Sequence, residues 1–100
     1  MNTSKTEIRL APAQSVYVTE DSLIVDLEDG RTISVPLAWY PRLVHGTTEE
    51  RNNWQLLIRG ESIYWPDLDE DISVENLLAG MPSGESQRSF KKWLESRKAF

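Results

Sequence analysis

Apolar and polar residues alternate along three short stretches in the first third of the chain. The apolar residues that recur at every second position are Val16, Val18, Leu23, Val25, Leu27, Ile33 and Val35. A period of two is typical of strands that bury one face. Asp29-Gly30 separates two of the stretches, and this pair favours a type I′ turn, in which both central residues have positive φ. The pattern predicts an antiparallel β-meander joined by two-residue turns.

Short helices are predicted in the middle of the chain. Pro41 fits the start of a helix that runs toward Val44, because a proline deeper inside a helix would remove a backbone hydrogen bond. Thr47 and Glu50 have the spacing of a capping box, which predicts the start of a second helix. Ser73 is a candidate N-cap for a third.

Further strands and an amphipathic segment complete the pattern. Alternation resumes in two stretches, at Trp54, Leu56 and Ile58 and at Ile63 and Trp65. We expect both tryptophans of these stretches to lie in the core. From Ser86 to Phe100, Phe90, Trp93 and Leu94 recur at helical spacing among basic residues, which predicts an amphipathic C-terminal helix.

These elements predict a single α+β fold. It contains a small antiparallel sheet of about four to six strands, with an N-terminal β-meander, short helices and a C-terminal amphipathic helix. One hundred residues is a typical length for one domain. We assign residues 1–80 to the α+β domain and residues 81–100 to a linker and helix appended to the same domain.

The composition excludes several kinds of chemistry. The chain has no cysteine, one histidine and a net charge of −5. The lack of cysteine excludes a disulfide scaffold, a thiolate zinc site and a cysteine nucleophile. An excess of acid makes direct nucleic-acid binding an unfavourable interpretation. Neither a signal peptide nor an apolar run of about 18 residues occurs, so we expect a soluble, cytoplasmic protein without membrane partners.

The negative charge is concentrated in one part of the chain. Residues 61–80 carry six acidic and no basic residues, whereas residues 81–100 carry five basic and two acidic ones. The sign of each block bears more directly on partners than the net charge does. The basic C-terminal helix could contact the acidic block of a second copy, which would give a homodimer.

Two segments carry a resemblance to a known family. They are Trp39–Leu43 (WYPRL) and Trp65–Ile72 (WPDLDEDI). With the Asp-Gly-Arg turn, they make the chain resemble the small, mostly bacterial proteins called domain of unknown function 2442, over Val16 to Gly80. The resemblance implies a compact α+β domain without an assigned activity. It also implies a link, in some members, to toxin–antitoxin gene pairs. The helix-turn-helix domain of other members does not fit in the few residues after Gly80.

The acidic run has a metal-binding interpretation, which the spacing does not support. Asp67, Asp69 and Asp71 match the first, third and fifth ligand positions of an EF-hand loop. That loop also needs glycine at its sixth position and glutamate at its twelfth, where this chain has Ile72 and Leu78. An EF-hand is therefore excluded, and paired carboxylates for acid–base catalysis lack a second catalytic element.

Two interpretations of the acidic run remain open. In the structural one, Asp69 or Asp71 caps the start of the following helix, and Arg42 or Arg51 pairs with one of the carboxylates. In the functional one, the acidic residues form a surface that binds a partner.

The aromatic residues and the C-terminal helix also have two interpretations each. Trp39 and Tyr40, beside Pro41 and Arg42, have the composition of an interface anchor, or they cover the edge of the core. The C-terminal helix packs back on the sheet, or it docks in the groove of a partner. His45 fits a cap at a helix C-terminus.

The favoured function is a non-enzymatic protein-interaction module, with an antitoxin-like role in a two-gene module as its more specific form. The partner would be the product of a neighbouring gene, met through Trp39, Tyr40, Arg42, Asp67, Asp69, Glu70, Asp71 and Glu75. The alternative is a small-ligand or divalent-metal-binding domain that uses the acidic loop. No catalytic, cofactor-binding or metal-binding residue is assigned.

Overall fold

The computed structural model describes residues 11–98, so the first ten residues of the predicted domain lie outside it. Its strands are β1 (Ala13–Val18), β2 (Ser22–Leu27), β3 (Thr32–Pro36), β4 (Gln55–Leu57), β5 (Ser62–Trp65) and β6 (Glu70–Ser73). Its helices are α1 (Pro41–Val44), α2 (Thr48–Asn52), α3 (Val74–Leu78) and α4 (Gln87–Arg97), with 3₁₀ turns η2 (Leu37–Trp39) and η3 (Ile58–Gly60). The α+β class is confirmed, and the six strands form two antiparallel sheets of three.

The first sheet is the predicted β-meander, with strand order β1-β2-β3. Its second turn differs from the prediction. The loop contains three residues, because the Leu27 N–H donates to the Arg31 carbonyl at 2.8 Å and the Gly30 N–H donates to the Leu27 carbonyl at 3.1 Å. Gly30 has a φ of 95°, whereas Asp29 is not among the residues with positive φ. The prediction of a two-residue type I′ turn was therefore wrong, since a three-residue loop needs only one left-handed residue.

The second sheet has strand order β4-β5-β6. The strand predicted to reach Ile58 stops at Leu57, so that part of the prediction was wrong. The backbone reverses there through consecutive left-handed residues, with φ of 52° at Ile58, 56° at Arg59 and 90° at Gly60. The acidic segment that was interpreted as a loop before a helix instead forms a hairpin, in which β6 returns along β5.

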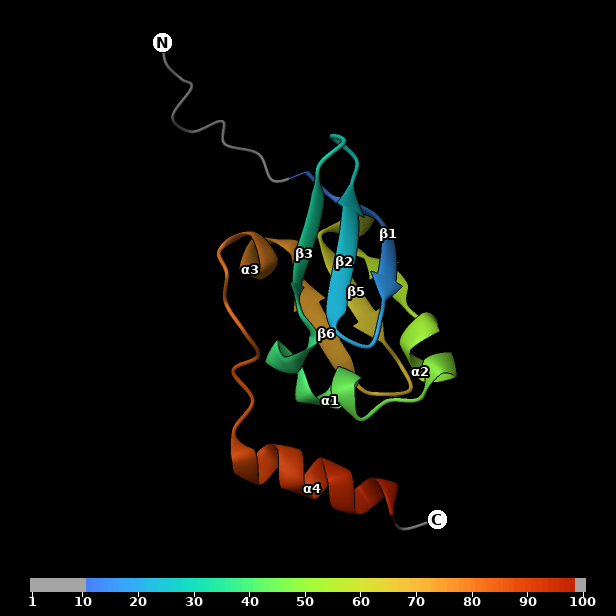
Figure 1. Ribbon diagram of the computed structural model, residues 1–100, viewed down its shortest axis with the longest axis vertical. Coiled ribbons are helices and arrows are strands. Elements are labelled where there is room, and N and C mark those ends of the chain that lie inside the picture. The colour runs from blue at the N-terminus through green and yellow to red at the C-terminus, as the bar shows by residue number, and fades with distance from the viewer. Residues whose placement is uncertain (1–10, 99–100) are drawn as a thin grey trace.

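One hydrophobic core joins the two sheets. In Figure 1 the sheet β1–β3 lies in front of β5 and β6, and α1 and α2 lie at the lower end of the body. The fully buried large side chains are Trp65, Leu23, Leu27, Leu37, Leu43, Ile63, Leu68, Val25 and Val74. The prediction that Trp65 lies in the core is confirmed, and its indole N–H donates to the Arg51 carbonyl at 2.9 Å. Trp54 packs against this core but is only partly buried.

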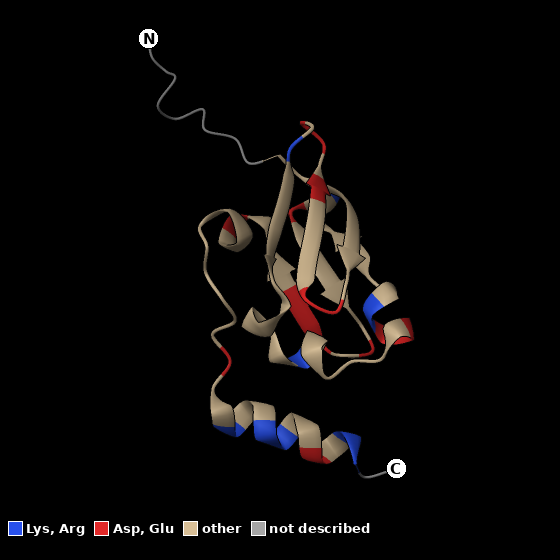
Figure 2. Ribbon diagram, viewed as in Figure 1, with Lys and Arg blue, Asp and Glu red and all other residues tan. Residues whose placement is uncertain are grey.

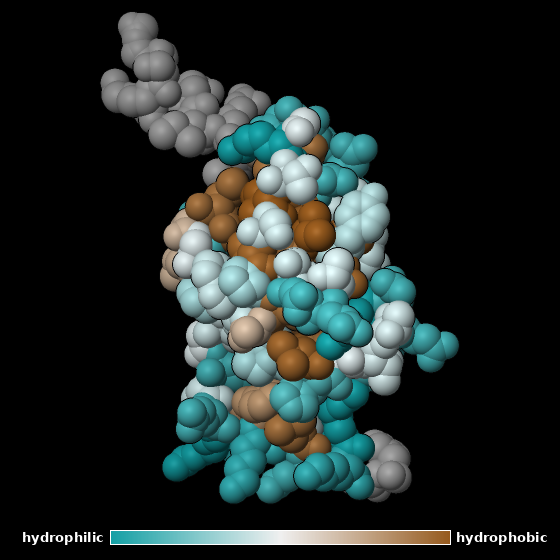
Figure 3. Space-filling view, in the orientation of Figure 1, coloured by the Kyte–Doolittle hydropathy of each residue, from teal (hydrophilic) through white to brown (hydrophobic). Residues whose placement is uncertain are grey.

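The C-terminal helix α4 lies apart from the sheets, below α1 and α2 (Figure 1). The prediction of this helix is confirmed over Gln87–Arg97, with Ser86 as N-cap, and residues 99–100 of its predicted range lie outside the described residues. Figure 2 shows basic residues gathered on α4 and most acidic residues on the body. In the same orientation the surface over α4 is mainly hydrophilic, whereas apolar surface gathers on the body (Figure 3). Among residues 11–98, none of the helices is long and apolar enough to cross a membrane.

Gly60 provides a test of the close approach between the β4–β5 turn and strand β1 of the other sheet. A β-carbon at Gly60 would lie 2.7 Å from the Ala13 carbonyl oxygen, whereas one at Gly30 would meet nothing within 4 Å. Both glycines have positive φ, so alanine costs about 1–2 kcal/mol at either position. The clash at Gly60 adds on the order of 1–3 kcal/mol. We expect Gly60→Ala to lower the free energy of unfolding in urea clearly more than Gly30→Ala does, and equal losses would contradict the close approach.

Candidate functional site

The acidic run surrounds the β5–β6 hairpin turn. Leu68 is fully buried, whereas its neighbours Asp67 and Asp69 are exposed, because the turn directs alternate side chains to opposite sides. Asp67 accepts a hydrogen bond from the Asn53 side chain at 3.0 Å. Neither carboxylate of the turn caps α3, and the prediction that Asp69 or Asp71 does so was wrong. Four residues of β6 lie between the turn and the helix, and Ser73 is the N-cap.

Asp71 and Glu75 lie away from this turn. Asp71 accepts a hydrogen bond from the Ser62 hydroxyl on the neighbouring strand β5. Glu75 is exposed in the first turn of α3. Within residues 11–98, no three histidine, cysteine, aspartate or glutamate side chains lie close enough together to hold a metal ion.

Arg42 joins four parts of the molecule. It belongs to α1, and its side chain is only 14% exposed. One guanidinium nitrogen donates to the Asp69 carbonyl at 3.0 Å, and a second donates to the Glu85 carboxylate at 2.9 Å. The guanidinium carbon also lies 5.2 Å from the centre of the Trp93 ring in α4. Arg42 therefore ties α1 to the hairpin turn, to the segment before α4 and to α4 itself.

The predicted pairing of Arg42 with the acidic run is present but weak. The Arg42–Asp69 ion pair has a nitrogen–oxygen distance of 3.8 Å, and the Asp69 side chain is 79% exposed. Glu85 is the stronger partner, and its hydrogen bond to the guanidinium holds the pKa of the Glu85 carboxyl below its usual value. Arg51, the other predicted partner, donates to the carbonyls of Leu43 and Val44 instead.

The aromatic candidates at the end of η2 are largely covered. Tyr40 is buried, and its hydroxyl donates to the Met81 carbonyl at 3.3 Å. Trp39 is partly buried, and its carbonyl accepts the Ser83 N–H at 3.0 Å. Both residues therefore hold the segment between α3 and α4. The predicted partner-binding residues do not form one continuous exposed surface.

Glu70 is the acidic residue with the most unusual surroundings. It pairs with Trp65 across the sheet, and Ile72 on the same strand pairs with Ile63. Because alternate residues share a face, the Glu70 side chain lies on the same side as Ile63 and Ile72, which are buried. It also lines a cavity of about 120 Å³ between β6 and residues 81–84, together with Tyr40.

Burial raises the pKa of the Glu70 carboxyl to about 7. The positive charge of Arg42 opposes this shift, and the carboxylates of Glu85, Asp71 and Asp69 add to it. Glu70 is thus an acid with a pKa near neutrality next to the segment that leads to α4.

Polar and aromatic contacts hold α4 against the body. Arg97 donates to the Glu50 carboxylate at 2.8 Å and lies over the Trp93 ring, with its guanidinium carbon 4.7 Å from the ring centre. Phe90 contacts His45 edge to face, with ring centres 5.2 Å apart. The predicted cap at His45 is confirmed, since it is the C-cap of α1 and its ring nitrogen lies 3.0 Å from the Pro41 carbonyl oxygen.

Sequence reasoning missed the partners that hold α4. Glu85 was placed in a linker, although it is the main partner of Arg42 across 43 positions of sequence. Glu50 was identified only as part of a capping box, which is confirmed, but it also binds Arg97. The only available signals were the acidic residue Glu85 in the linker and the basic residue Arg97 in the last turn of the predicted helix. Neither charge specifies its partner.

Comparisons with known proteins place the chain by family and fold. The family described as protein of unknown function, DUF2442, matches residues 13–83. A protein of unknown function from Rhodospirillum rubrum is 25% identical, with a TM-score of 0.67 over 79% of this chain and 98% of its own. An uncharacterised protein from Chromobacterium violaceum is 20% identical, with a TM-score of 0.62 over 81% of this chain and 74% of its own. No curated protein matches the sequence.

The raised pKa of Glu70 predicts a pH-dependent stability. Its folded-state value of about 7 exceeds the ordinary value of 4.5, so the folded state holds the proton more tightly. Ionisation therefore lowers stability as the pH rises from about 4.5 through 7. We expect Glu70→Gln to be nearly neutral at pH 5 and to raise the free energy of unfolding by about 2–3 kcal/mol at pH 8. Urea titrations at both pH values measure this, with Glu20→Gln as an exposed control, and a pH-independent difference would contradict the burial of Glu70.

Arg42→Met tests the junction between the hairpin turn and α4. The substitution keeps an apolar stem but removes the guanidinium donor from Glu85, which retains only the Ser89 hydroxyl, and from the Asp69 carbonyl. We expect a loss of about 2–3 kcal/mol, between the values for exposed and buried pairs. The control Arg97→Met removes a more exposed pair and should cost about 0.5–1 kcal/mol. Urea unfolding gives both values, and a small loss at Arg42 would show that the junction contributes little.

Proposed function

The chain belongs to the DUF2442 family of proteins of unknown function, and we propose that it is a non-enzymatic protein-interaction module whose docking element is α4. The observation that carries this proposal is the burial pattern of the helix. None of the side chains of Gln87–Arg97 is buried, although Phe90, Trp93 and Leu94 gather on one face. A helix with an apolar face that its own domain covers only in part is suited to a groove on another protein.

The connection of α4 to the body supports its release. Residues 81–86 form no helix or strand, so the helix can move without unfolding a neighbouring element. Release breaks the Arg97–Glu50 pair, the Phe90–His45 contact and the contacts of Trp93. These are partly exposed interactions, each worth about 1 kcal/mol or less. A partner with a matching apolar groove can compensate for their loss.

The charges of α4 indicate the chemistry of such a partner. The exposed basic residues of the helix and its C-cap are Arg88, Lys91, Lys92 and Lys98. A groove with an apolar floor and an acidic rim would match both faces, and opposite charges would speed association.

The more specific proposal is an antitoxin-like role in a two-gene module. It rests on the resemblance to family members linked to such gene pairs, and the proposed partner is the product of a neighbouring gene, met in the cytoplasm. The exposed carboxylates Asp67 and Asp69 would border the docking surface, next to Arg42. The other candidate partner of α4 is a second copy of the chain. If each copy docks its α4 on the body of the other, the result is a homodimer formed by exchange of helices.

Co-expression with the product of a neighbouring gene tests the docking element. We expect Trp93→Ser to reduce the co-purified partner by about tenfold, since aromatic anchors contribute more than about 1 kcal/mol at interfaces. The matched control is Tyr17→Ser, because Tyr17 is 55% exposed and belongs to β1, away from α4. Light scattering of the purified protein distinguishes a second copy from another partner by its mass.

Each outcome has a defined meaning. Equal co-purification with wild type and Trp93→Ser would show that α4 is not the docking element. If no neighbouring product co-purifies, and withholding this protein does not change the toxicity of that product, the antitoxin-like role is wrong. A doubled mass that Trp93→Ser abolishes would identify a second copy as the partner.

A further inference from the structure

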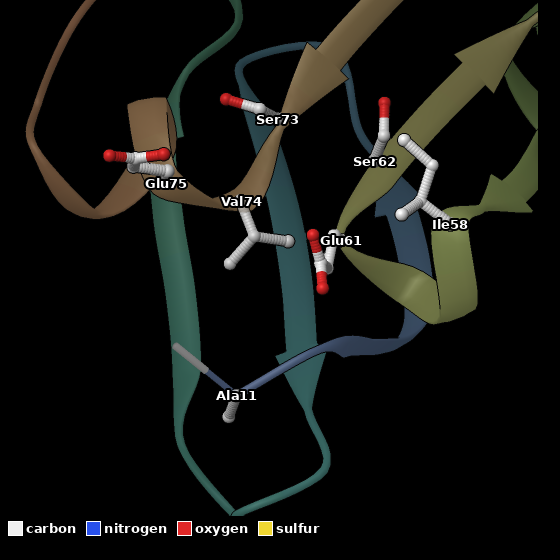
Figure 4. A pocket seen from close by; sticks show the side chains of 7 residues that line it. All are labelled: Ala11, Ile58, Glu61, Ser62, Ser73, Val74 and Glu75. Carbon is white, nitrogen blue, oxygen red and sulfur yellow. The ribbon is translucent and has the colours of Figure 1, made fainter. Parts of the chain in front are cut away.

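A cavity of about 570 Å³ lies at the end of the second sheet, between the start of β5 and the start of α3. Figure 4 shows the side chains that line it, which are Ala11, Ile58, Glu61, Ser62, Ser73, Val74 and Glu75. Its volume falls within the usual range for ligand pockets. Val74 and Ser62 are buried and form the inner part of the lining, whereas Glu61 and Glu75 are exposed.

The rim of the cavity carries an apolar residue in a strained backbone conformation. Ile58 has a φ of 52°, which is an outlier for a β-branched side chain. Its side chain is nevertheless 68% exposed, more than any other large hydrophobic residue in the described part of the chain. Asparagine would adopt this conformation with less strain and would suit the exposure better. Neither folding nor solubility accounts for isoleucine here, and strained residues of this kind gather at binding sites.

The charged side chains among the described residues that line the cavity are all acidic. Glu61 and Glu75 approach the cavity from different elements, η3–β5 and α3, and no lysine or arginine of residues 11–98 lines it. Within residues 11–98, neither carboxylate takes part in an ion pair. Two carboxylates above an apolar wall match a cation on an aliphatic stem, because such a side chain buries its methylene groups and keeps its charge at the surface.

We propose that this cavity binds a basic side chain, lysine or arginine, that a partner protein presents next to an apolar residue. The aliphatic stem lies against Val74 and Ala11, the charged group lies between Glu61 and Glu75, and the neighbouring apolar residue covers Ile58. The exposed Ile58 favours a protein segment over a free diamine, since a diamine would leave this side chain in water. The site is separate from α4, so the proposal does not depend on the docking role of that helix.

Nuclear magnetic resonance titration of the isotope-labelled full chain tests the proposal with blocked tripeptides. The probe is acetyl-Val-Lys-Val-amide, and its neutral counterpart contains norleucine in place of lysine. A third titration uses 1,4-diaminobutane. We expect the lysine probe to shift the amide signals of residues 58–62 and 73–75 and to bind at least about fivefold more tightly than the norleucine probe.

Three variants locate the site. The pair Glu61→Gln and Glu75→Gln should weaken the lysine probe about fivefold to tenfold. The control pair Glu20→Gln and Glu28→Gln makes the same charge change in the loops of the first sheet. It should alter the affinity for the lysine probe by less than about twofold. Ile58→Asn should weaken binding about threefold while the melting temperature stays equal or rises, which separates binding from folding.

The remaining outcomes overturn the proposal. Equal binding of the norleucine probe would show that the cavity does not select a cation, and tight binding of the diamine alone would identify a free amine as the ligand. If the double variant Lys5→Gln, Arg9→Gln binds the lysine probe more tightly than the wild type does, the chain's own basic residues are the occupant of the cavity. The absence of any shift at residues 58–62 and 73–75 would remove the site.

Discussion

The arrangement of the lower end of the molecule depends on the guanidinium group of Arg42. Its planar set of donors reaches a hairpin carbonyl and the Glu85 carboxylate at once, and its face lies against Trp93. Lysine could not make these contacts together, because its ammonium group is a point charge without a face. One side chain thus links the acidic turn, the segment after α3 and α4. The hydrophobic core reaches the acidic turn through the buried Leu68 and is contacted by Trp93, but no side chain of α4 is itself buried.

This division separates two kinds of stabilisation. The sheets are joined by buried apolar contacts, which are non-directional and lost only when the fold opens. The helix α4 is held by ion pairs and aromatic contacts at the surface, which a competing surface can replace one by one. A carboxyl with a pKa near 7, Glu70, lies next to the segment that connects the two parts. The attachment of α4 therefore rests on charged contacts, which salt and pH weaken more than they weaken the apolar contacts of the core.

The sequence predicted those features that depend on local spacing. The meander, the capping box at Thr47, the short helix from Pro41 and the C-terminal helix follow from periods and caps within a few residues. The hairpin of the acidic run was missed because its three aspartates resemble a polar loop, and the buried Leu68 between them is a single apolar signal. The Arg42–Glu85 pair was missed because it joins residues far apart in sequence, and many charges compete as partners.

Three positions depart from what folding alone favours. Ile58 is a β-branched residue in a left-handed conformation, Glu70 is a carboxyl on the buried side of a strand, and Trp93 is a large aromatic residue that its own domain covers only in part. Each lowers stability or solubility relative to a simple alternative at the same site, namely asparagine, glutamine and a small polar residue. Departures that the fold does not need are expected where a sequence serves a second purpose. Ile58 lines the larger cavity, Glu70 lines the smaller cavity beside residues 81–84, and Trp93 lies in α4. These three positions therefore lie at two ends of the molecule, and none of them is on the exposed turn that carries Asp67 and Asp69.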